Sequence, residues 1–156
     1  MKKFIKLNAE ELKKTVCDIL DKLNIKYKTE VNSAVGSSII GKGRRVDVVL
    51  YDNKGSVVMH IECKSQNVPG TAEDKLFKAV VESNRDKSLG IPSIIVFSGF
   101  GWNSADVRHA LLNGSVRIEM FEEWINFYLK YQKMRPEILD TEIIDLGLFA
   151  SENMPE

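Results

Sequence analysis

Two acidic residues and a lysine lie in two segments that are predicted to form neighbouring β-strands. The runs Val46–Tyr51 and Val57–Cys63 are apolar and β-branched, and the segment between them is rich in Asp, Asn and Gly, which predicts a β-hairpin. Side chains alternate along a strand, so Glu62 and Lys64 share one face. Pairing that buries the apolar rows of both strands places Asp47 on that same side.

Such a cluster favours a bound cation, because two nearby carboxylates repel each other and force one to hold a proton. Few protein ligands, all of them oxygens, suit Mg²⁺, which keeps several waters. Lys64 is no ligand while protonated, but it can contact a phosphate and orient, or deprotonate, an attacking water. Gln66 adds a neutral donor and acceptor on this face, and His60 is a further residue that lines it.

At these residues the sequence resembles the PD-(D/E)XK nuclease superfamily. The match is Asp47 followed by Glu62-Cys63-Lys64, although the proline usual before the aspartate is absent; the longer pattern Glu-x-Lys-x-Gln, ending at Gln66, resembles several type II restriction endonucleases. The resemblance implies an α/β fold with an αβββαβ core and a mixed central sheet flanked by helices. It also implies Mg²⁺ as cofactor and the backbone carbonyl of Cys63 as an extra metal ligand.

The chain has 156 residues, of which 44% are hydrophobic, so it can bury one core. No apolar run approaches the roughly 18–20 residues that span a bilayer, and no signal segment is evident. We therefore expect a soluble, cytoplasmic protein with no membrane partner and no organic cofactor. Cys17 and Cys63 are expected to be core residues, not a disulfide or a zinc pair.

The net charge is zero but unevenly distributed. Six of the 22 acidic residues, and none of the 22 basic ones, fall in residues 136–156, which leaves residues 1–135 with a charge of +6. A body of that sign can bind a polyanion such as DNA. We expect residues 1–135 to form the nuclease-like domain, and the acidic, apolar tail 136–156 to pack on it or on a second subunit.

The first predicted helix is capped near Asn8 and runs to about Leu23. In the superfamily that this sequence resembles, the first helix often offers an acid to the metal site, and Glu10 and Glu11 are the candidates here. We select Glu11. The alternative is that both are surface acids favoured by the helix dipole at an amino terminus.

A half-buried strand, Ile25–Val31, leads into the glycine- and serine-rich segment Asn32–Gly43. We expect a loop there, and its basic residues Lys42, Arg44 and Arg45 are candidate contacts to a DNA phosphate backbone. The alternative is an ordinary hairpin connection whose charges are simply solvated.

Beyond the hairpin, Ser65 and Asn67 flank Gln66 and are further candidate DNA contacts. The remaining predicted elements are a helix 72–85, a strand Ile91–Phe97, a helix Ser104–Leu112, a strand Val116–Met120 and a helix from Phe121 or Glu122 to about Met134. The order helix, three strands, helix, strand matches the αβββαβ core, and the later elements resemble the second half of restriction endonucleases.

These observations predict a magnesium-dependent endonuclease that hydrolyses DNA phosphodiester bonds, of the type II restriction class. Cleaving both strands needs two sites, so we expect a homodimer. A Holliday-junction resolvase or a homing endonuclease on the same fold would share these residues. Two alternatives remain open: a non-catalytic DNA-binding protein, and a domain whose charged face is mere surface.

Overall fold

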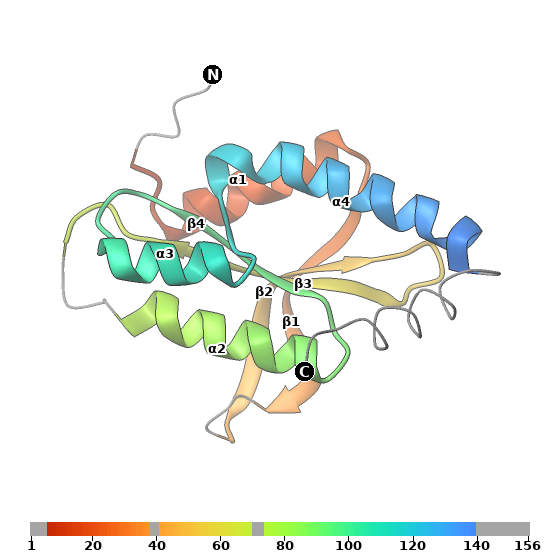
Figure 1. Ribbon diagram of the computed structural model, residues 1–156, viewed down its shortest axis with the longest axis horizontal. Coiled ribbons are helices and arrows are strands. Elements are labelled where there is room, and N and C mark those ends of the chain that lie inside the picture. Colours follow the sequence, from red (N-terminus) through yellow and green to blue (C-terminus); the bar gives the residue numbers. More distant parts are fainter. Residues whose placement is uncertain (1–5, 38–40, 70–73, 140–156) are drawn as a thin grey trace, which may run out of the picture. The chain divides into compact units, whose positions relative to one another are not determined.

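The computed structural model describes residues 6–37, 41–69 and 74–139, which form a five-stranded sheet and four helices (Figure 1). The elements are α1 (Ala9–Lys22), β1 (Lys26–Ser37), β2 (Gly43–Tyr51), β3 (Val57–Ser65), α2 (Asp74–Ser88), β4 (Ser93–Ser98), α3 (Ser104–Leu112), β5 (Val116–Arg117) and α4 (Ile118–Leu139).

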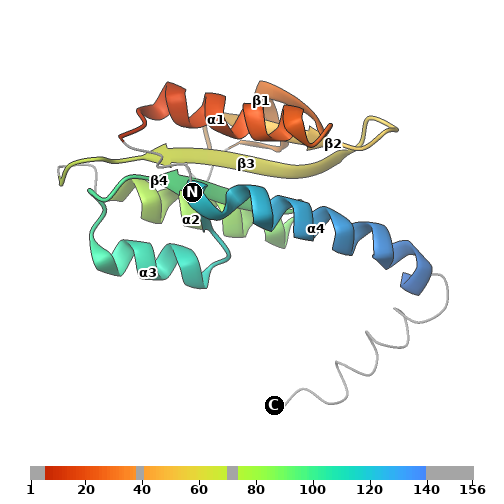
Figure 2. The same cartoon turned by 90° about the horizontal axis from the view of Figure 1, so that it is seen from above.

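The strands lie in the order β1-β2-β3-β4-β5, so the sheet follows the chain. β1, β2 and β3 pair antiparallel, whereas β4 pairs parallel with both β3 and β5. α1 covers one face of the sheet, and α2 and α3 cover the other (Figure 2). The predicted αβββαβ order and mixed sheet are confirmed.

α1 forms as its sequence dictates. The Asn8 side chain accepts a hydrogen bond from the Glu11 amide, and the Glu11 carboxylate accepts one from the Asn8 amide, which together make a capping box. Leu12, Val16 and Leu20 are fully buried, and their spacing puts them on one stripe of the helix. This stripe fixes α1 against the sheet.

The β2–β3 hairpin also follows the prediction. Asp52 accepts hydrogen bonds from the amides of Lys54 and Ser56, and Gly55 supplies the positive φ that the turn needs. However, β3 is buried on both faces, so its polar face is not exposed to solvent. Its polar residues His60 and Glu62 lie under α2 because β3 is a central strand.

Several boundaries differ from the predicted ones. β1 continues to Ser37, into the segment that we expected to be a loop, because β2 pairs with it as far as Gly43. β5 has only two residues, and α4 begins at Ile118, since Ile118 and Phe121 are buried three positions apart as a helix requires. α2 is described from Asp74, and residues 70–73, where we predicted its start, lie outside the described residues.

The chain divides into two compact units, Met1–Glu122 and Glu123–Glu156. In the second unit, the rings of Trp124 and Tyr128 stack. The predicted tail largely falls in 140–156, outside the described residues, so its packing stays a prediction.

Among the described helices, none is long and apolar enough to cross a membrane. Both cysteines are free.

Candidate active site

The site begins where β2 and β3 stop pairing. Their ladder ends at Val48 and Ile61, and beyond it the Oδ2 atom of Asp47 accepts a hydrogen bond from the Cys63 amide at 2.8 Å. The amide and carbonyl of one strand residue point to the same side of the strand. The Cys63 carbonyl is therefore directed to the side on which Asp47 lies.

Glu62 lies close to Asp47 and is 8% exposed. Burial raises the pKa of Glu62, and the charge of Asp47 and a hydrogen bond with it raise this pKa further, to about 8, against the lowering effect of Arg44 and Lys64. At neutral pH, with no cation bound, Glu62 therefore largely keeps its proton. This is the expected state of paired acids that lack a bound cation.

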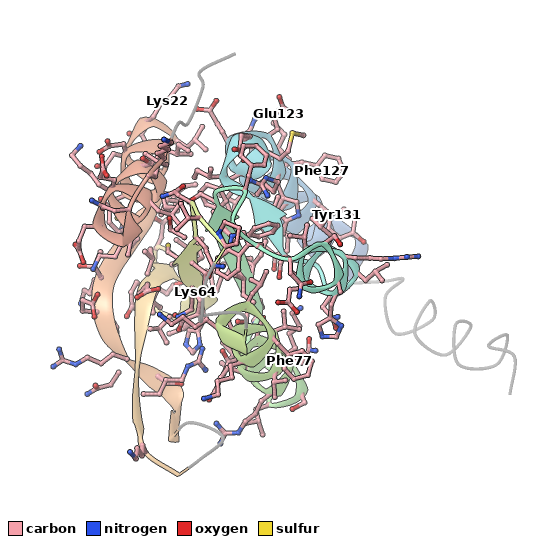
Figure 3. All side chains as sticks on the ribbon, turned by 90° about the vertical axis from the view of Figure 1, so that its left-hand side faces the viewer. Lys22, Lys64, Phe77, Glu123, Phe127 and Tyr131 are labelled. Atoms are coloured by element: carbon pink, nitrogen blue, oxygen red, sulfur yellow. The ribbon has the colours of Figure 1, made fainter. Side chains whose placement is uncertain are left out.

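Lys64 follows on the same face of β3. The parallel register pairs Glu62 with Ile95 and Lys64 with Phe97. Ile95 and Phe97 pack in one cluster with the α2 residues Leu76 and Val80. Because paired residues share a face of the sheet, Glu62 and Lys64 also project towards α2. They line a pocket of about 250 Å³ at the end of β3, where Figure 3 labels Lys64. α2 contributes Lys75, Lys78, Ala79 and Glu82 to this pocket, and β2 contributes Arg44 and Arg45.

Arg44 is not the exposed loop residue that the sequence suggested. It lies inside β2 and is 9% exposed. Its Nη1 donates to Asp86 Oδ1 at 2.6 Å, and its Nη2 donates to Glu62 Oε1 at 3.1 Å. Glu82 lies 3.7 Å from the same guanidinium. Arg44 thus holds and orients Glu62 from within the protein, and its contact with DNA stays a prediction.

His60 lies deeper still and is fully buried. Its Nδ1 is 3.2 Å from Asp86 Oδ2, and its Nε2 has no hydrogen-bond partner in the described part of the chain. Burial alone would raise the pKa of Asp86, but the hydrogen bonds with His60 and Arg44 hold that pKa below its ordinary value. His60 therefore supports the site from below and does not line the pocket.

A comparison with protein families adds the deciding observation. A family model described as a PD-(D/E)XK nuclease superfamily domain matches residues 2–135. The chain belongs to the PD-(D/E)XK nuclease superfamily. Members of this superfamily are generally nucleases, and they typically use divalent metals.

Two other comparisons are less informative. No curated protein matches the chain. Among solved structures, the chain is similar to the crystal structure of a protein of unknown function, AF1548, at 20% sequence identity and a TM-score of 0.48. The match covers 67% of this chain and 54% of that one. The chain therefore spans about half of that protein's length.

The donor set fits a divalent metal of the superfamily. Asp47, Glu62 and the Cys63 carbonyl provide only oxygen atoms. In the described part of the chain, no group of three or more His, Cys, Asp or Glu side chains could hold an ion, so two carboxylates are the side-chain ligands that this site offers. A site with two carboxylates suits Mg²⁺, because this ion keeps several waters and binds substrate oxygens. A bound cation would also replace the proton that Glu62 keeps in its absence.

Three further candidates, Ser65, Gln66 and Asn67, form hydrogen bonds within the protein, and their roles in catalysis or DNA binding stay predictions. Gln66 donates its amide hydrogen to Gly101 O at 2.9 Å. The side chains of Ser65 and Asn67 both donate to the backbone carbonyl of Leu7. Gln66 does not line the pocket that contains Lys64, because its side chain turns to the loop after β4. These three side chains tie loops together and are already hydrogen-bonded.

The other candidates divide into two groups. Glu11 completes the α1 capping box and does not join Asp47 and Glu62 in a three-residue cluster. Lys42 is exposed, and Arg45 is exposed and lines the pocket, so their contact with DNA stays a prediction.

Sequence reasoning missed the polar stripe of α2. Lys75, Lys78, Glu82 and Asp86 are spaced three and four residues apart and therefore share one face of the helix. This spacing was present in the sequence. Only the apolar positions of this helix were used to orient it, so its second, polar face was not recognised.

Proposed function

We propose that the protein is a magnesium-dependent endonuclease that hydrolyses DNA phosphodiester bonds. One observation carries the proposal: Asp47 and Glu62 meet where the β2–β3 ladder ends, and Glu62 shares a pocket with Lys64. Two neighbouring carboxylates, one of which shares a pocket rich in basic residues with a lysine, suit a polyanionic substrate and a divalent cation together. Membership of the superfamily supports the same reaction class.

Each side chain has a distinct task in this mechanism. When bound, Mg²⁺ supplies positive charge that polarises the phosphate and lowers the pKa of a coordinated water. Asp47 and Glu62 would hold it, together with the Cys63 carbonyl oxygen. Lys64 contacts the scissile phosphate and orients the attacking water. Arg44 keeps Glu62 in place through the contact between its guanidinium and Oε1.

Within nucleases, we propose a type II restriction endonuclease, on the basis of the Glu-x-Lys-x-Gln pattern. A Holliday-junction resolvase or a homing endonuclease would use the same Asp47, Glu62 and Lys64. The substrate separates these classes: a restriction enzyme cuts linear duplexes at defined sequences, and a resolvase cuts four-way junctions. The products should carry 5′-phosphate and 3′-hydroxyl ends.

The direct test is to incubate the purified protein with supercoiled, linear and branched DNA, with and without Mg²⁺, and to sequence the ends. Wild type should cut in Mg²⁺ only, and Lys64→Ala should lower the rate by about 10²–10⁴-fold, the range of a lost proton-transfer or orienting group. Lys54→Ala, in the exposed β2–β3 turn, serves as the control. A Lys64→Ala protein as active as wild type would contradict the mechanism.

Metal binding can be measured without activity. Mg²⁺ should raise the melting temperature of wild type, because a ligand that binds only the folded state stabilises it. Asp47→Asn should abolish this rise. If the melting temperatures of wild type and Asp47→Asn respond equally to Mg²⁺, these carboxylates are not the metal site.

A second function is favoured by one observation. The guanidinium of Arg44 already pairs with Glu62 inside the protein, so the carboxylates have a built-in counter-charge. A non-catalytic DNA-binding protein could keep the fold in this way. Its signature would be DNA binding that needs no metal, without cleavage of any of the three DNA forms.

A further inference from the structure

α2 carries a polar stripe that faces the polar row of β3. At the inner end Asp86 is fully buried and contacts His60. Glu82, further along, contacts Arg44. At the outer end Lys75 and Lys78 are exposed beside Lys64. The stripe thus changes from a buried acid, through the half-buried Glu82, to exposed bases as it approaches the candidate active site.

The outer end of this stripe lines one pocket together with Glu62 and Lys64. Five of its eight lining residues are basic and two are acidic. One of those bases, Arg44, is already paired with carboxylates. In the described part of the chain, Arg45, Lys64, Lys75 and Lys78 form no ion pair, so four cationic side chains are available to a ligand.

The pocket suits a phosphate group better than a small organic molecule. Its volume of about 250 Å³ lies below the usual range of roughly 300–1,000 Å³ for small-molecule sites, which are also mostly apolar. Lysine is a flexible point charge that binds phosphate without demanding a fixed geometry. In DNA complexes, such contacts to phosphates set the position of the strand on the protein.

We propose that Lys75 and Lys78, together with Arg45, form a second phosphate-binding site that holds the phosphate next to the scissile one on the same DNA strand. Lys75 and Lys78 are three residues apart and lie side by side on the helix. Successive phosphates of one strand are about 3.4 Å apart along the duplex axis. The site rests on the proposed function, because Lys64 in the same pocket marks the scissile position.

The test compares two double variants that lose the same charge. One is Lys75→Gln/Lys78→Gln. The control is Lys26→Gln/Lys54→Gln, whose lysines are exposed near the other end of the hairpin. The probe is a short labelled DNA duplex in EDTA, where metal-dependent cleavage cannot occur. Its affinity is measured over a range of salt concentrations, and the melting temperature of each variant is checked.

Each lost phosphate contact lowers the slope of log K against log[salt] by about 0.9. The α2 variant should therefore lose about 2 from the slope and bind roughly 30-fold more weakly at about 0.15 M salt. The control should keep the wild-type slope. An α2 variant with the slope and affinity of the control overturns the site, as does a wild type that does not bind the duplex.

A second measurement separates this site from the proposed function. In Mg²⁺, the Lys75→Gln/Lys78→Gln protein should show a raised KM with a smaller change in kcat, because the lysines hold substrate and do not act on the reacting atoms. Lysine-dependent DNA binding without any cleavage by wild type would keep the phosphate site and refute the hydrolysis. If wild type cleaves DNA and the variant keeps the wild-type KM and salt slope, the hydrolysis stands and the phosphate site is refuted.

Discussion

Arg44 carries a positive charge where three carboxylates surround it. Its guanidinium contacts Glu62, Glu82 and Asp86 while being almost completely buried. Buried ion pairs gain little over apolar packing, but removing one partner leaves unpaired charge in the interior. We therefore expect this residue to affect folding as well as the proposed catalysis.

Arg44→Gln should lower the free energy of unfolding by about 3–5 kcal/mol, because it leaves buried carboxylates without a partner. The neighbouring Arg45→Gln is the matched control: Arg45 is exposed, and its loss should change stability by no more than about 0.5 kcal/mol. Urea denaturation measures both. Equal stabilities for the two variants would show that the guanidinium of Arg44 does not support the fold.

Asp86 should make the free energy of unfolding depend on pH in the acidic range. Its folded-state pKa lies below the ordinary value of 3.8, so its stabilising effect is complete above 3.8 and is lost as the pH falls through the folded pKa. Asp86→Asn should thus differ most from wild type near neutral pH and less near about pH 3. Urea denaturation at both pH values tests this, and a constant difference would contradict it.

At the scale of single residues, strand alternation predicted the direction of side chains only within the strand itself. The alternation within a hairpin was enough to predict that Asp47, Glu62 and Lys64 would lie on one side of it. Gln66 follows the same alternation on paper, but β3 ends before it, and its amide donates to Gly101, 35 residues away. A contact of that range is set by tertiary packing, which the sequence pattern does not contain.

The loops after β3 and β4 meet backbone to backbone. A Cβ added at Gly101 would lie 2.5 Å from the carbonyl carbon of Val68, and one at Gly99 would lie 2.6 Å from that of Gln66. The Gly101 amide also donates to Gln66 O. Glycine is required here by the closeness of two main chains.

Gly101→Ala should therefore destabilise the protein by about 1–3 kcal/mol, the usual effect of forcing atoms into a packed region. Gly43→Ala is the control, because a Cβ there meets nothing within 4 Å and its φ is not left-handed. It should be neutral or stabilise by up to about 1 kcal/mol. Thermal unfolding of both proteins decides the matter, and a Gly101→Ala melting temperature equal to that of wild type would refute the close contact.

Elements with strong local signals were predicted well. α1 had its cap and its apolar stripe, and the β2–β3 hairpin had its turn residues. The extension of β1 to Ser37 had no such signal, because it depends on β2 pairing alongside. The early start of α4 at Ile118 was missed because the segment 116–120 reads equally as strand or helix when taken alone.

The order of elements along the whole chain was predictable, since helix and strand periodicities follow one another in the αβββαβ pattern. How α2 lies on β3 was not, because opposing the two polar rows needs both the sheet register and the rotation of the helix about its axis. The basic end of the pocket consequently emerged only in three dimensions.

A complete double-strand cut requires two copies of the site, and this gives a test of the proposed homodimer. Mixing wild type with an excess of Lys64→Ala protein, under conditions that allow subunit exchange, should shift the products from linear to nicked circular plasmid. Gel electrophoresis separates these products, and sedimentation gives the mass of the particle. An unchanged ratio of linear to nicked product would refute a dimer that cuts both strands together.

The hydrogen bond from the Cys63 amide to Asp47 turns one backbone proton into a natural NMR probe. Its chemical shift depends on the electron density of the carboxylate that accepts it, so titrating the ¹⁵N-labelled protein with an ion would move this resonance if Asp47 binds that ion. Asp47→Asn would provide the reference spectrum. Occupancy of the site could thus be followed at a single atom pair, with no nucleic acid in the tube.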